Sequence, residues 1–90
     1  MESDGQGLRV TFSQFVITLA SSALVHLGEQ ADPATGQKSI NLPLARHSID
    51  VIGILEEKTK GNLDDEEAKL IDALLFELRS KFITISQAQS

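Results

Sequence analysis

The segment from Phe12 to Leu27 constrains this chain most, because it carries no formally charged residue and is apolar on almost every side. Apolar side chains recur in it at the three-then-four spacing of one helical face. Ile17 and Val25 add apolar surface on the opposite side, so other elements must cover a helix of this kind. The residues of its main apolar face are Phe12, Phe15, Val16, Leu19, Ala20, Ala23, Leu24 and Leu27.

Two further helices are predicted to provide that cover. Asn41 followed by Pro43 is typical of a helix start. An asparagine side chain there accepts hydrogen bonds from free backbone amides, and proline is tolerated in the first turn because amides at that position have no helical partner. We therefore expect a helix over Leu42 to Lys60. Asp64 and Glu67 have the spacing of a capping box, which begins a third helix. The apolar residues of that helix share one face and are Ala68, Ile71, Leu74, Leu75, Leu78 and Phe82.

The link between the second and third helices predicts how they are arranged. Only Gly61, Asn62 and Leu63 separate them, so they must form an antiparallel hairpin. The longer connection, residues 29–41, contains the turn sequence DPATG and is expected to be a surface loop. The predicted fold class is all-α, with the hairpin packed on the apolar first helix in an oligomeric bundle.

Ninety residues are enough for one domain with a limited core. We expect a flexible leader over residues 1–10, a single helical domain over 11–85 and a disordered tail over 86–90, where the apolar pattern ends. Short strands over 8–12 and 82–85 are an alternative for the two ends, because both stretches have a strand-like pattern.

Gly53 lies in the middle of the second predicted helix, where glycine costs about 1 kcal/mol relative to alanine. It marks either a weak point or a close helix crossing. Ala20 and Ala23 of the first helix are small enough to be the other side of such a crossing.

The charge balance argues against several classes of partner. Thirteen acidic and eight basic residues give a formal net charge of -5, which repels nucleic acids and anionic lipid surfaces. The uncharged run from Val10 to Gly28 is long enough to cross a bilayer, but polar residues dilute it and no cluster of basic residues flanks it. Membrane association is therefore a minor alternative. The absence of cysteine fits a reducing compartment, so we expect a cytoplasmic protein.

Candidate chemical residues are few. His26 and His47 each have a carboxylate three residues later, at Glu29 and Asp50, which is a spacing that metal ligands use on a helix. A complete site needs three or four ligands, and no metal-binding motif supplies the others. No nucleophile elbow, phosphate-binding glycine loop or cysteine nucleophile is present. We expect no enzyme activity, cofactor or metal; a metal or small-ligand site using the two histidines is the alternative hypothesis.

Four segments of the chain together form a recognisable pattern: FVITLASSALVHLG from Phe15, DPATG from Asp32, NLPLARHSIDVIGILEEKTKGNL from Asn41 and DDEEAKLIDALLFELR from Asp64. They resemble domain-of-unknown-function family 1844, a family of bacterial proteins. The resemblance covers roughly residues 12–83 and is most specific in EEKTKGNL, which begins at Glu56. It implies a small helical protein of uncharacterised function and brings no catalytic residues.

These features favour a non-catalytic interaction or structural module. A hairpin offers one apolar face while the first helix has two, and an exposed apolar patch usually marks an interface. We expect a homo-oligomer, a dimer before a tetramer, formed through the apolar face that begins at Phe12, with another protein as a further partner. Capping and helix-dipole effects also explain the charges at the hairpin tip. The candidate partner surface there consists of Glu56, Glu57, Lys58, Lys60 and Asn62.

Overall fold

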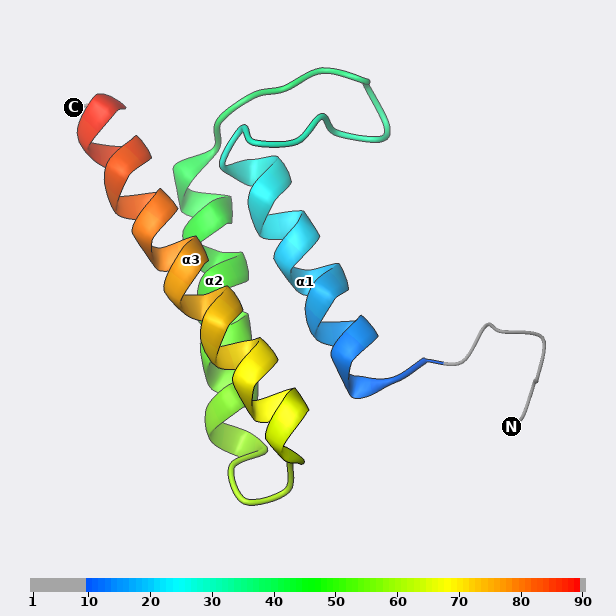
Figure 1. Cartoon of the computed structure of the whole chain (residues 1–90). Coiled ribbons are helices and arrows are strands. Elements are labelled where there is room, and N and C mark those ends of the chain that lie inside the picture. The colour runs from blue at the N-terminus through cyan, green and yellow to red at the C-terminus, as the bar shows by residue number, and fades with distance from the viewer. Residues whose placement is uncertain (1–9, 90) are drawn as a thin grey trace.

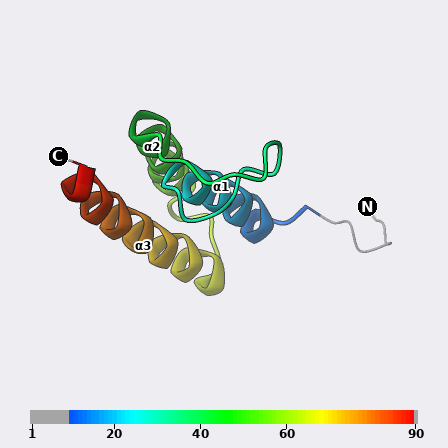
Figure 2. The same cartoon turned by 90° about the horizontal axis from the view of Figure 1, so that it is seen from above.

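The computed structural model describes residues 10–89, which form three α-helices (Figure 1). They are α1 (Phe12–His26), α2 (Leu42–Lys58) and α3 (Asp65–Gln89). The chain runs along the bundle in one direction in α1, returns in α2 and reverses again in α3, so α2 and α3 form the predicted antiparallel hairpin (Figure 1). Each helix contacts both of the others, and from above they form one bundle (Figure 2). The all-α, three-helix expectation is confirmed.

Side-chain caps begin all three helices, at the predicted Asn41 and Asp64 and also at Thr11. Thr11 Oγ1 and Asn41 Oδ1 each accept a hydrogen bond, at 3.1 Å, from the backbone amide three residues later. Asp64 Oδ1 accepts from the amide of Glu67 at 2.8 Å, and Glu67 Oε1 accepts from the amide of Asp64 at 3.0 Å. This reciprocal pair is the predicted capping box. Such caps satisfy backbone amides that the first turn of a helix leaves without partners.

The core is aliphatic and receives residues from each helix. No polar or charged side chain is buried among residues 10–89. The hydrophobic effect therefore supplies most of the stabilisation, in proportion to the apolar area removed from water. The buried residues are Val16, Ala20, Ala23, Leu27, Ala45, Ile49, Ile52, Ile71, Leu75 and Leu78.

The connection between α1 and α2 projects from one end of the bundle (Figure 1). Gly28 begins it with a φ of +82°, a conformation that glycine adopts without steric cost. The amide of Asn41 donates to the carbonyl oxygen of His26 at 2.7 Å, which brings the two ends of the connection together. Within it, the Asp32 carbonyl accepts from the amide of Gly36 at 2.7 Å. The predicted turn is confirmed.

Two predicted boundaries are wrong. The second helix ends at Lys58 rather than Lys60, and there the Thr59 hydroxyl donates to the carbonyl oxygen of Leu55 at 2.7 Å. The third helix continues to Gln89, through most of the stretch predicted to be a disordered tail. Adding a residue to an existing helix is easier than starting one, and Ile85 packs against the core. Residues 82–85 are therefore helical, and residues 1–9 of the predicted leader lie outside the described part of the chain.

Candidate interaction surfaces

The predicted oligomer face of α1 is covered inside the subunit. Four of its residues are at most 3% exposed, and three more are partly buried against the same core; only Phe15 is exposed, at 46%. The hairpin covers this face because both of its helices turn their apolar sides toward it. This corrects the sequence-based assignment of the face to an oligomer interface. The covered residues are Val16, Ala20, Ala23 and Leu27, with Phe12, Leu19 and Leu24 beside them.

The most exposed large apolar side chains within the helices lie elsewhere. Phe76 of α3 is 75% exposed, and Ile83 of α3 and Ile54 of α2 are each 57% exposed. None of these three belongs to an apolar face predicted from the sequence. A helical repeat shows which residues share a face but not which faces the bundle covers. The available signal is the seven-residue spacing of Phe76 and Ile83, which is close to two helical turns.

Phe76 and Ile83 lie at the centre of the outer face of α3. Two small residues and two charged residues of the same helix share this face with them. We call these six residues the α3 face: Asp72, Ala73, Phe76, Arg79, Ser80 and Ile83.

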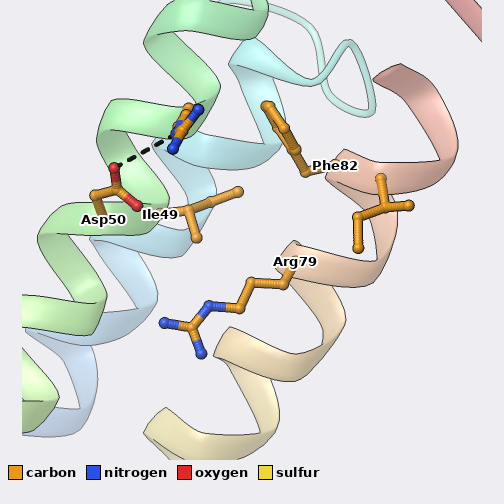
Figure 3. A pocket seen from close by; sticks show the side chains of 6 residues that line it. Ile49, Asp50, Arg79 and Phe82 are labelled. Carbon is orange, nitrogen blue, oxygen red and sulfur yellow. Dashed lines mark ion pairs between the residues drawn. The ribbon is translucent and has the colours of Figure 1, made fainter. Parts of the chain in front are cut away.

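A shallow groove between α2 and α3 adjoins the α3 face and shares Arg79 and Ile83 with it (Figure 3). Its volume is about 250 Å³, below the usual ~300–1,000 Å³ of a small-molecule site. On the α2 side, Arg46 Nε lies 3.9 Å from Asp50 Oδ2, with both side chains largely in water. Such an exposed pair contributes at most about 1 kcal/mol. The groove is lined by Arg46, Ile49, Asp50, Arg79, Phe82 and Ile83.

Arg79 reaches from α3 toward α2 (Figure 3). A Cβ atom added at Gly53 would lie 3.0 Å from Arg79 Nη2, and it would meet no atom of Ala20 or Ala23 within 4 Å. The close approach at Gly53 is therefore to this side chain, so the crossing with α1, one of the two alternatives for Gly53, is wrong.

The hairpin tip presents the other predicted partner surface. Four of its five residues are exposed, and Glu56 is half-buried. The amide of Asn62 donates to the carbonyl oxygen of Thr59 at 2.8 Å, so this residue also helps to form the turn. None of the charged residues at the tip forms an ion pair with another described residue. The surface consists of Glu56, Glu57, Lys58, Lys60 and Asn62.

The two histidines do not gather carboxylates around them. Glu29 Oε1, three residues after His26, lies 3.4 Å from Lys81 Nζ of α3. Asp50, three residues after His47, pairs with an arginine. Across residues 10–89, no group of three or more histidine, aspartate or glutamate side chains is placed to hold a metal ion. The structure thus lends no support to the alternative hypothesis of a metal site.

The helices also bear on the membrane alternative. α1 is the most apolar of the three and has 15 residues, whereas a helix that spans a bilayer needs about 20. Within residues 10–89, no helix combines the length and the apolar character needed to cross a membrane.

The comparison with protein families bears on the whole bundle. The model for a domain of unknown function, DUF1844, matches residues 9–84. The chain belongs to the DUF1844 family. The DUF1844 match includes all of α1 and α2 and most of α3, which confirms the resemblance seen in the sequence. No curated protein and no solved structure matches the chain. Membership of DUF1844 assigns no activity, so function must be argued from the surfaces described above.

Proposed function

We propose that this DUF1844 protein is a non-catalytic interaction module that acts as a homo-oligomer, with a dimer as the first form. The observation that carries the proposal is the exposure of Phe76 and Ile83, at 75% and 57%, on one face of α3. Exposed apolar patches rimmed by polar residues mark interaction sites, and Phe76 and Ile83 share their face with Asp72, Arg79 and Ser80. Self-association removes such a patch from water.

The acidic surface supports a protein as the further partner. The net charge of -5 favours a basic protein surface over nucleic acid. The hairpin tip adjoins Asp64, Asp65 and Glu66, which are exposed at the start of α3. We assign the second partner to this end of the bundle, at the opposite end from the long connection (Figure 1).

Size-exclusion chromatography with light scattering tests the self-association. Over a dilution series, the mass is expected to approach twice the 9.8 kDa of the subunit at high concentration and to fall toward it on dilution. A mass that stays at one subunit up to millimolar concentration would contradict the proposed function.

A further inference from the structure

We propose that two copies of this chain pack their α3 faces together in an antiparallel arrangement. Phe76 lies at the two-fold axis, and Asp72 of each copy lies beside Arg79 of the other. This inference rests on the proposed self-association and specifies the surface and the geometry that produce it. The occupant of the α3 face is thus a second copy of the same chain.

The shape of the α3 face suits another helix. Phe76 and Ile83 form its central ridge, and Ala73 and Ser80 lie beside them. Small residues next to large ones let a second helix approach closely and interdigitate its own ridge. A two-fold axis is the simplest closed arrangement for such a self-complementary surface.

Charge decides the direction in which the second helix runs. Asp72 lies one turn before Phe76 on the α3 face, and Arg79 lies about one turn after it. Neither side chain forms an ion pair with another residue in the described part of the chain. A two-fold axis at Phe76 makes the second helix run in the opposite direction. Asp72 of each copy then lies beside Arg79 of the other, which gives two opposite-charge pairs. A parallel pair would instead place Asp72 level with Asp72 and Arg79 level with Arg79, and would form neither of these opposite-charge pairs.

The whole length of α3 shows the same polarity. Acidic residues occupy its first turn, at Asp65, Glu66 and Glu67, whereas Arg79 and Lys81 lie in its second half. A two-fold axis at Phe76 places residues 65–67 opposite residues 85–87 of the other copy, which carry no charge. Antiparallel pairing therefore keeps the two acidic first turns apart, whereas a parallel pair would bring them together.

The length of α3 gives an independent reason to expect a neighbour. α3 has 25 residues and α2 has 17, so the end of α3 extends beyond the start of α2 (Figure 1). This end contains Ile83 and Thr84, two β-branched residues that have a lower helix propensity. Helical structure at such residues depends on packing against a neighbour. In the proposed pair, the start of the partner's α3 lies along this end and the aliphatic stem of the partner's Lys69 covers Ile83.

A charge exchange tests the pairing of Asp72 with Arg79. In sedimentation equilibrium, Asp72→Arg alone and Arg79→Asp alone are each expected to raise the dimer Kd about tenfold or more, because each sets like charges together. The double variant D72R/R79D is expected to regain most of the wild-type affinity. Glu77→Arg, a control at an exposed residue of α3 outside the face, is expected to leave the Kd unchanged.

The pairing would be overturned if the double variant had a dimer Kd as high as those of the two single variants. Circular dichroism of each variant shows whether the helices remain folded, because Arg79 also lies against α2.

A second pair of variants tests the apolar centre without changing a charge. Phe76→Ser is expected to raise the dimer Kd at least tenfold, whereas Ile54→Ser, at an exposed residue of α2, is expected to leave it unchanged. If the wild type dimerises and Phe76→Ser dimerises equally well, the α3 interface is wrong but the proposed homo-oligomer stands. If the wild type is monomeric at millimolar concentration, both proposals are wrong.

Discussion

At the residue scale, three glycines show that the surroundings of a Cβ atom decide the effect of adding one. Gly28 and Gly36 both have positive φ, at +82° and +72°, but only Gly28 has a close neighbour, Ile40. Gly53 lies within a helix and faces the flexible end of Arg79. The sequence singles out Gly53 and places Gly36 in the turn sequence DPATG, but only the packed structure shows which neighbours each glycine meets.

Replacement of Gly28 by alanine is expected to lower the free energy of unfolding by about 2 kcal/mol or more, from left-handed backbone strain and a clash. The new Cβ atom would lie 2.8 Å from Ile40 Cγ1. Gly36→Ala is the matched control, because it has the same backbone strain and its new Cβ meets no tertiary neighbour within 4 Å among residues 10–89. Urea denaturation measures both, and an equal loss in the two variants would show that the clash contributes nothing.

Replacement of Gly53 by alanine is expected to raise the free energy of unfolding by about 0.5–1 kcal/mol, because alanine favours the helix over the unfolded chain. Among the described residues, the tertiary neighbour of the new Cβ is Arg79 Nη2 at 3.0 Å, at the end of a side chain that can move away. Thermal unfolding measures the change. A lower melting temperature would mean that the position of Arg79 against α2 is rigidly required.

At the element scale, helix starts follow closely from the sequence and helix ends do not. The starts depend on local hydrogen bonds from Thr11, Asn41 and Asp64, and local hydrogen bonds can be predicted from residue type and spacing. The ends depend on packing as well. α3 continues to Gln89 beyond the predicted end of the domain, as an extension of a helix whose Phe82 and Ile85 pack against the core.

The capping box gives the prediction that belongs to this scale. Asp64→Ala is expected to lower the free energy of unfolding by about 1 kcal/mol, because the amide of Glu67 loses its 2.8 Å partner. Asp65→Ala, one residue further on, loses only a favourable interaction with the helix dipole and is expected to cost less than about 0.5 kcal/mol. Urea denaturation distinguishes the two, and an equal cost would contradict the role of the cap.

At the scale of the whole molecule, the chain has more apolar surface than its own bundle covers. The sequence predicts this surplus but places it on the face of α1 that contains Val16 and Ala20, which the hairpin buries. Which apolar residues stay exposed depends on how the three helices pack, and no local sequence pattern contains that information. The exposed surplus instead includes Phe76 and Ile83 on α3, so the candidate site becomes visible only in the folded chain.

Distances between spin labels on two copies test the antiparallel α3 pair most directly. The chain has no cysteine, so single labels can be attached outside the α3 face through Glu77→Cys and, separately, Gln87→Cys. With 1.5 Å of rise per residue, a two-fold axis at Phe76 separates the two copies of residue 77 by ~3 Å along the helix and those of residue 87 by ~33 Å. A short distance at residue 77 and a long one at residue 87 is the predicted result. Similar short distances at both sites, or no distance between copies at either, would contradict it.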